Sequence, residues 1–397
     1  MAILNSNNTI SNTKSSTKNN DFSNALAINF THTLIASAVG VLVPLYMLQK
    51  DIQVEKIGMI FAVLSVVMLI FRYIFAVVAD IIGTRLIFLL SSITHVITIV
   101  IYMFATQPLH FSIGKTFEGL RASTFWAVNR TEIYNIAKTN AGKNASLISS
   151  LRMFGAFLGR AIIGIVLLFI TIENAFLAVI IISTLLFFYS LKIKNHTKQS
   201  EKIKLNNFIS PLRKKRAGSF WIDSVVLSIN AFYEASVVPL ILPIYLITIV
   251  KVSAAEVGIA LALYSIAYTV AGFLAIRKNL SMHKVVYATI MFGALPFLLL
   301  VNVDFIPSLF IIMLLGVGAG FGNVIDETSM AKVVKKSSAV STDISVLVVP
   351  YRIIEFITLI VFGFAVAMFG FYPIFIFLGI SMAAYSILAW KYILNKN

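Results

Sequence analysis

The sequence predicts an all-α polytopic membrane protein with twelve transmembrane helices in two six-helix bundles. Three observations support this fold class. Hydrophobic residues make up 59% of the 397 residues and charged residues only 12%, roughly half the charged share of a soluble protein. Apolar runs recur along the whole chain, each long enough to cross a ~30 Å hydrocarbon core as a helix. A long basic stretch divides these runs into two sets of six.

The apolar runs predict helices because a membrane barrel would need alternating segments of about ten residues, and the sequence has none. In the first half, the expected helices cover residues 22–48, 56–78, 86–106, 110–135, 146–170 and 173–192. In the second half, they cover residues 218–248, 255–276, 285–303, 307–330, 343–369 and 372–393. The halves are thus residues 22–192 and 218–397, joined by the basic linker 193–217.

The tail and loops predict the orientation. Residues 1–21 are rich in Asn, Ser, Thr and Lys and lack an apolar core, so we expect a disordered tail rather than a signal peptide. Of the 32 basic residues, 22 fall in or beside the loops on the side of both termini, and only Lys50, Lys56 and Lys251 in the opposite loops. By the positive-inside rule, both termini are expected to be cytoplasmic, in a protein of the plasma membrane.

The net charge of +16 is explained by this loop asymmetry, so we expect no nucleic-acid partner. The run from Arg213 to Arg216 could contact the headgroups of membrane lipids, although a solvated linker is the simpler interpretation. We also expect no cofactor and no metal. The chain has no cysteine, and its histidines are scattered, with His95 expected to be a satisfied interior side chain. The glycine-rich run 316–322 lies inside an expected helix, which favours close packing over a nucleotide-binding loop.

A charged loop between the second and third expected helices carries the most informative motif. Asp80, Gly83 and Arg85 lie between two membrane-length apolar segments. The run 76–85 resembles the loop between helices 2 and 3 of the major facilitator superfamily, whose pattern is G-x-x-x-D-R/K-x-G-R/K-R/K. The three named residues match this pattern, whereas its first glycine and two of its basic positions are not matched.

The resemblance covers essentially the whole chain and implies a function. We number the twelve expected helices in chain order as spans 1 to 12. The resemblance implies two bundles that rock about a midplane cavity lined mainly by spans 1, 4, 7 and 10. The chain is then expected to be a monomeric secondary transporter of a small organic solute. Because it has no nucleotide-binding loop, uphill transport must be driven by an ion gradient, which we expect to be a proton gradient. Export of drugs or metabolites is the leading expectation. The alternative is an importer, proton-coupled or facilitative, and a membrane enzyme is least supported because no catalytic constellation is found.

The resemblance also implies a gate made of charged residues. In this family the loop acid, here Asp80, lies near the start of span 11, and the loop base, here Arg85, reaches an acid that ends span 4, here Glu132. The physics supports such contacts, because an acid at a helix N-terminus gains from the dipole and an Arg–carboxylate pair can be bidentate. Arg277 and Asp326, near equivalent positions of the second half, are expected to form a degenerate second copy.

Span 4 carries a polar stripe formed by Lys115, Glu118, Trp126 and Asn129, with Arg121 beside it. At 100° per residue the four stripe residues share one helix face. Charge inside a bilayer costs several kcal/mol unless it is paired or hydrated, so these residues are candidates for the substrate or proton pathway, with structural ion pairs as the alternative. The segment 115–119 resembles the R-x-x-Q-G motif of the family, in which the arginine is often tied to proton coupling.

Span 5 contains Arg152 and Arg160 among glycines at 155, 159 and 164. Small residues at this spacing predict close helix approach. The segment faintly resembles the span-5 motif of the family's antiporters, G-x-x-x-G-P-x-x-G-G. Arg160 departs from this motif at the proline position, and it is instead a candidate for contact with an anion.

Spans 7 and 11 supply the remaining pathway candidates. Asn230 and Glu234 share one face of span 7, and Glu234 has no basic residue three or four positions away. It is therefore the leading proton-carrier candidate, and it must be protonated, hydrated or paired across the cavity with Arg121 or Arg160. Arg352 and Glu355 are close enough to pair within span 11, which favours a structural role. The mixed charges leave drugs, zwitterions and organic anions open as substrates.

Overall fold

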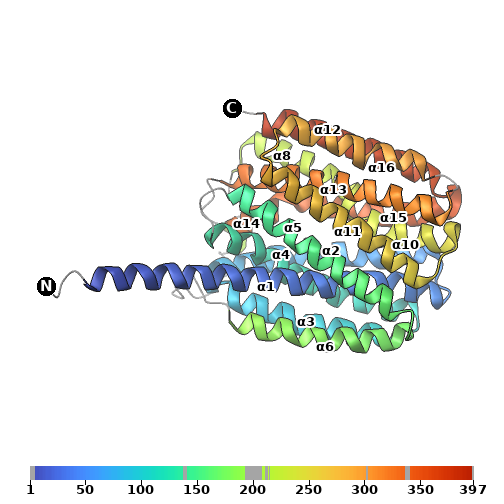
Figure 1. Cartoon of the computed structure of the whole chain (residues 1–397), viewed down its shortest axis with the longest axis horizontal. Helices are drawn as coiled ribbons and strands as arrows, with labels where there is room; N and C mark the ends of the chain where they lie inside the picture. Colours follow the sequence, from blue (N-terminus) through green and yellow to red (C-terminus); the bar gives the residue numbers. More distant parts are fainter. Residues whose placement is uncertain are drawn as a thin grey trace.

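In the computed structural model of this protein, the described residues are 5–136, 141–192, 208–210, 213, 215–300, 303–335 and 340–395; within helices, the side chains of residues 5–22, 25, 130–136 and 141–147 lie outside this description. The described chain is helical with no strands. Figure 1 shows the helices lying side by side along one direction, with both chain ends at the same end of the molecule. We call this the terminal end.

The first half consists of six helices that each cross the molecule. They are α1 (Asn5–Gln49), α2 (Val54–Ile82), α3 (Thr84–Met103), α4 (Pro108–Ile136), α5 (Ala141–Val166) and α6 (Ile172–Leu191). Helix α4 packs between α2 and α3, and α1 packs against α5 and α6. Between α2 and α3 the chain reverses at Gly83, whose φ of 96° is a conformation that favours glycine.

The second half also crosses six times, but several crossings are interrupted. The first comprises α8 (Gly218–Ile229), α9 (Ala231–Glu234), η1 (Val237–Ile241), α10 (Leu242–Tyr245) and η2 (Leu246–Val250). The next three are α11 (Ala254–Arg277), α12 (Met282–Gly293) with η3 (Leu295–Leu299), and α13 (Phe305–Val334). The last two are α14 (Val340–Leu347) with α15 (Val349–Phe369), and α16 (Tyr372–Ala389) with η4 (Trp390–Leu394).

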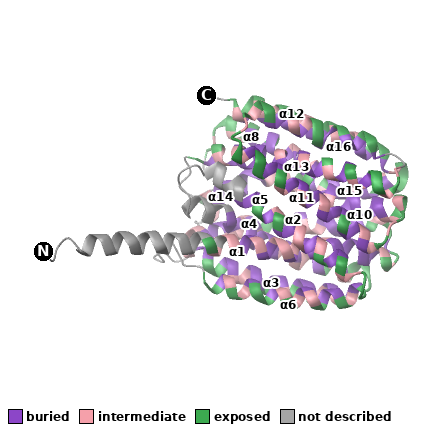
Figure 2. Cartoon of the chain, viewed as in Figure 1, coloured by how far each residue is buried: buried purple, intermediate pink, exposed green. Residues whose placement is uncertain are grey.

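The helices fit a membrane in length and surface. In the described residues, 11 helices are long and apolar enough to cross a bilayer. Helix α4 is not one of these, although it has 29 residues, because its polar stripe makes it too hydrophilic. Large apolar side chains such as Ile181 and Phe310 are 71% and 66% exposed, and Figure 2 shows exposed residues along the outer helices α3, α6 and α12. With α4 counted, the twelve expected spans and the all-helical fold are confirmed.

Glycines let the two halves approach each other closely. Helix α2 packs against α15, and α5 packs against α11. A Cβ atom built on Gly258 of α11 would lie 2.7 Å from Cα of Gly164 on α5, too close for any side chain at this position. Gly155 and Gly159 contact the α1 backbone in the same way. The close helix approach predicted for span 5 is therefore confirmed.

Three expectations need revision. The expected tail 1–21 is helical from Asn5 on, since α1 begins there; the segment has no Pro or Gly to stop a helix continuing from the apolar span. Span 7 is not one regular helix, because two π-helical stretches interrupt it. Helix α13 extends four residues beyond the expected end at residue 330. Most of the linker 193–217 lies outside the described residues.

Candidate functional site

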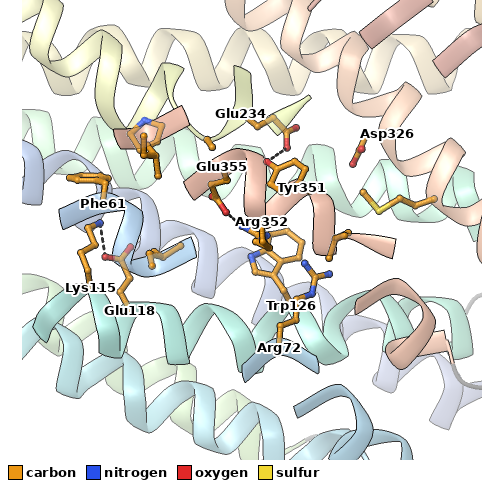
Figure 3. A pocket seen from close by; sticks show the side chains of 17 residues that line it. Phe61, Arg72, Lys115, Glu118, Trp126, Glu234, Asp326, Tyr351, Arg352 and Glu355 are labelled. Atoms are coloured by element: carbon orange, nitrogen blue, oxygen red, sulfur yellow. Dashed lines mark hydrogen bonds and ion pairs between the residues drawn. The ribbon is translucent and has the colours of Figure 1, made fainter. Parts of the chain in front are cut away.

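A cavity lies between the two halves of the molecule, in two adjoining lobes. The lobes have volumes of about 280 Å³ and 380 Å³, and they share the lining residues Gly40, Glu118, Trp126, Glu234, Pro239 and Asp326. We call the smaller one, which contains Lys115, the Lys115 lobe (Figure 3), and the larger one, which contains Arg160, the Arg160 lobe. Helices α1 and α4 from the first half and α9, η1 and α13 from the second line both lobes. Helices α2 and α15 add residues to the Lys115 lobe, and α5 and α11 add residues to the Arg160 lobe.

On α4, Glu118 is held between two buried cations. Its Oε2 lies 2.8 Å from Nζ of Lys115 and its Oε1 3.7 Å from Nη2 of Arg121. The hydroxyl of Tyr102 donates a third contact to Oε2 at 2.6 Å. The Lys115 ammonium also lies 3.8 Å from the centre of the Phe61 ring. The shared carboxylate offsets part of the charge of both cations, and all three groups are hydrogen-bonded, which lowers the cost of keeping the cluster ionised away from water.

A histidine that the sequence analysis did not single out joins this cluster. Nε2 of His32 on α1 lies 2.9 Å from Nη1 of Arg121. The His32 ring stacks on the Phe125 ring, with the two ring centres 3.5 Å apart. The centre of the His95 ring lies 5.6 Å from the centre of the His32 ring. The expectation of a satisfied interior His95 is wrong, since neither ring nitrogen has a hydrogen-bond partner in the described part of the chain. Asn29, one helical turn before His32, was a sequence signal for a polar face on α1.

Arg152 on α5 connects the two halves at the cavity wall. Its Nη2 lies 4.0 Å from Oε1 of Glu327 on α13 and donates to Ser149 Oγ at 2.9 Å. Ser149 in turn donates to Oδ1 of Asn323 at 2.9 Å. The Arg152 guanidinium also lies 4.5 Å from the Trp126 ring centre. Glu327 was missed by sequence reasoning because Asp326, adjacent to it, was expected at the end of its helix rather than in the cavity wall.

Arg160 reaches from α5 to α11 inside the Arg160 lobe. Its Nη1 donates to the carbonyl oxygen of Leu261 at 3.4 Å and to the hydroxyl of Ser265. Both partners are uncharged. In the described residues, no Asp or Glu forms an ion pair with Arg160, although this residue is only 9% exposed.

Glu234 lies at the break in span 7 and lines both lobes. The hydroxyl of Tyr351 on α15 donates to its Oε2 at 3.3 Å (Figure 3). The arginines that could have paired with it across the cavity are held elsewhere, Arg121 by Glu118 and His32 and Arg160 by Ser265. Asn230 also lines the Arg160 lobe. A π-helix follows Glu234, a distortion that is frequent at functional sites.

Two other predicted residues pair as expected and one does not reach the cavity. Nη1 of Arg352 donates to Oε2 of Glu355 at 2.5 Å within α15, so the predicted pair within the helix is confirmed. Both residues line the Lys115 lobe (Figure 3). Asn129, assigned to the α4 stripe, is buried but lines neither lobe.

In the described residues, no three His, Asp or Glu side chains gather closely enough to hold a metal.

The residues assigned to the gate fall into two groups. Asp80, at the end of α2, accepts hydrogen bonds from the backbone N–H and the hydroxyl of Thr342 on α14, the position that the resemblance implies. Arg85, in the first turn of α3, is exposed, while the Glu132 side chain lies outside the described residues.

The second set of gate residues is separated. Arg277 is exposed at the end of α11, whereas Asp326 is buried in the cavity wall. The difference arises because α13 continues eight residues beyond Asp326 to Val334, about 12 Å of helix.

The comparisons agree with this architecture. The sequence profile described as Major Facilitator Superfamily matches residues 25–238. Three solved structures have a similar fold: the human organic anion transporter MFSD10 (TETRAN) with a TM-score of 0.72, the E. coli fucose:proton symporter FucP with 0.67, and the nucleoside transporter NupG with 0.66. Each shares 12% identity and is matched over 94% of this chain and 98–99% of its own. At this identity the likeness shows the fold alone. None of the curated proteins compared with the chain matches its sequence.

Proposed function

This chain belongs to the major facilitator superfamily, and from that premise we propose that it is a proton-coupled secondary transporter of a small organic solute. The observation that carries this proposal is the cavity between the two halves, where Arg152 of one half meets Glu327 of the other. Its larger lobe, at about 380 Å³, is within the size range of small-molecule sites. The aromatic walls and the charged groups of both signs suit recognition of an organic solute.

Transport would proceed by rocking of the halves about this cavity. The contacts between halves divide into two kinds. The glycine contacts of α5 with α11 form a closely packed seam. The polar contacts, such as Asp80 with Thr342, can break and re-form as the cavity opens to one side or the other. A charge-assisted contact of this kind contributes about 1–3 kcal/mol, small enough for solute binding to shift the equilibrium.

Glu234 is the proposed proton carrier. It is exposed to the cavity and accepts a hydrogen bond from the Tyr351 hydroxyl, a bond that the carboxyl group can accept in both its charged and its protonated form. Glu118 is less suited, because two cations and a tyrosine hydroxyl hold its charged form. A proton taken up by Glu234 on one side would be released when the cavity opens to the other.

Export is the proposed direction of transport, supported by the glycine spacing of span 5 that resembles the family's antiporters. Uptake is the alternative, and the similarity of fold to a fucose:proton symporter supports it. The two directions differ in how solute and proton are coupled, since an exporter exchanges them and a symporter moves both the same way.

Purified protein in proteoliposomes tests the proposal. Vesicles loaded with neutral, cationic and anionic organic compounds are assayed for counterflow and for uptake driven by an imposed pH gradient of either sign. We expect at least one compound to show counterflow and pH-driven accumulation. Counterflow without any pH dependence would contradict proton coupling, and absence of counterflow with every compound would contradict transport of these solute classes.

A further inference from the structure

The cavity has one more cation than it has acids. Six cationic residues line the two lobes, namely Arg72, Lys115, Arg121, Arg152, Arg160 and Arg352. Five acids line them, namely Glu118, Glu234, Asp326, Glu327 and Glu355. The cavity wall is therefore slightly positive when every residue carries its formal charge.

Arg160 is a cation without an acidic partner in the described chain. Lys115 and Arg121 share Glu118, and Arg352 pairs with Glu355. Among the described residues, Arg160 instead donates only to the hydroxyl of Ser265 and to the carbonyl oxygen of Leu261. Burying a guanidinium without a counter-charge costs several kcal/mol, so its position in a cavity wall calls for a function.

The free donors of Arg160 are available to the cavity. Both protein hydrogen bonds come from Nη1. Nη2 and Nε form no hydrogen bond within the described residues. These two nitrogens are not fully buried, whereas Nε of Arg352 is buried without a hydrogen-bond partner. These two nitrogens form one edge of the guanidinium, which matches the two oxygens of a carboxylate.

The side chains around this edge of the Arg160 guanidinium indicate the chemical character of the rest of the solute. Tyr233, Tyr264 and Tyr268 line the same lobe with Trp126. The close contact of Gly164 with Gly258, one turn further along α5, fixes the distance between α5 and α11, so the bonds to Ser265 and Leu261 hold the guanidinium in place. A preorganised cation beside aromatic side chains suits an anion with an apolar or aromatic body.

We propose that the solute of this transporter is a small organic carboxylate, and that Arg160 binds its carboxylate through Nε and Nη2. This inference rests on the proposed transport function and specifies its substrate class.

Three matched pairs of probes test the inference: benzoate and benzamide, salicylate and salicylamide, indole-3-acetate and its amide. Each is titrated against the purified protein, with the melting temperature as readout. We expect the carboxylates to raise the melting temperature and the amides to leave it unchanged. Arg160→Gln should weaken carboxylate binding by about 10- to 100-fold, the loss expected for a charge-assisted contact. Arg160→Lys should keep the preference for carboxylates with weaker binding.

The control is Lys284→Gln, which removes an equal charge from an exposed position on α12 and should bind the probes as the wild type does. The wild-type comparison of acid with amide decides the matter even if the Gln variant fails to fold. Equal effects of acid and amide, or no effect of any carboxylate, would overturn the inference. If neutral or cationic solutes then show counterflow, the proposed transport stands with another substrate class. If no solute of any charge shows counterflow, both proposals fail together.

Discussion

The Asp80 carboxylate accepts two hydrogen bonds from Thr342, one from its backbone N–H at 3.2 Å and one from its hydroxyl at 2.7 Å. Asp80 lies in the last turn of α2 in the first half, and Thr342 lies in the first turn of α14 in the second. An acid at a helix N-terminus is stabilised by the helix dipole. A single carboxylate thus joins the two halves at the terminal end of the molecule.

The first prediction concerns this contact. Asp80→Asn should leave solute binding largely intact and abolish turnover, because it removes about 1–3 kcal/mol of charge-assisted bonding far from the cavity and shifts the balance of conformations. Arg85→Ala is expected to do the same. Binding is measured by thermal shift and turnover by counterflow. Thr342→Ser, which keeps the hydroxyl, is the control. Parallel loss of binding and counterflow in the Asp80 variant would contradict a role confined to gating.

The second prediction is that the linker 193–217 and both termini are cytoplasmic, from the excess of basic residues on that side. The chain has no cysteine, so single introduced cysteines report without background. An impermeant maleimide should label Gln107→Cys in intact cells and label Ser210→Cys only after permeabilisation. The reverse pattern would show that the orientation is inverted.

The third prediction tests the buried charge cluster on α4. Glu118→Gln should destabilise the protein by about 3–5 kcal/mol, because Lys115 and Arg121 would lose their buried counter-charge. The double variant Lys115→Met with Glu118→Gln should recover part of this loss, since one of the two unpaired cations is then removed. Thermal unfolding in detergent measures both. A Gln variant as stable as the wild type would mean that water or ions already compensate these cations.

The fourth prediction tests the glycine seam. Gly258→Ala should cost about 1–3 kcal/mol, the typical penalty for overpacking, because its Cβ would lie 2.7 Å from Gly164 Cα. Gly218→Ala is the matched control, since nothing lies within 4 Å of a Cβ built there. Comparison of the two melting temperatures checks the prediction. An equal effect of both substitutions would indicate a change in chain flexibility rather than a packing clash.

Membrane helices could be predicted from the sequence because the cost of placing a side chain in the bilayer depends mainly on that side chain. The polar stripe of α4 and the pair within α15 follow from helix geometry, which is local as well. The contacts of His32 with Arg121 and of Tyr351 with Glu234 join residues 89 and 117 positions apart. Such contacts depend on how each helix is rotated in the bundle, and hydropathy does not determine this rotation.

Asp326 shows the same limit at a helix end. The residue was expected near the end of its span, which was predicted to cover residues 307–330. In the structure α13 runs on to Val334 with Asp326 and Glu327 buried, because the cavity and Arg152 accommodate these acids inside the bundle. Polar residues that end a span and polar residues that face a cavity look alike in the sequence.

The last prediction concerns proton coupling through Glu234. Glu234→Gln cannot ionise but can still accept a hydrogen bond from Tyr351, so the geometry of the cavity should be kept. We expect the variant to lose accumulation driven by a pH gradient while counterflow exchange survives. Tyr351→Phe is the matched control, because it removes the hydrogen bond and leaves the carboxylate free to titrate, so coupling should persist. If the Gln variant still accumulates solute against its gradient under an imposed pH difference, the carrier lies elsewhere, and Glu118 becomes the next carboxylate to substitute.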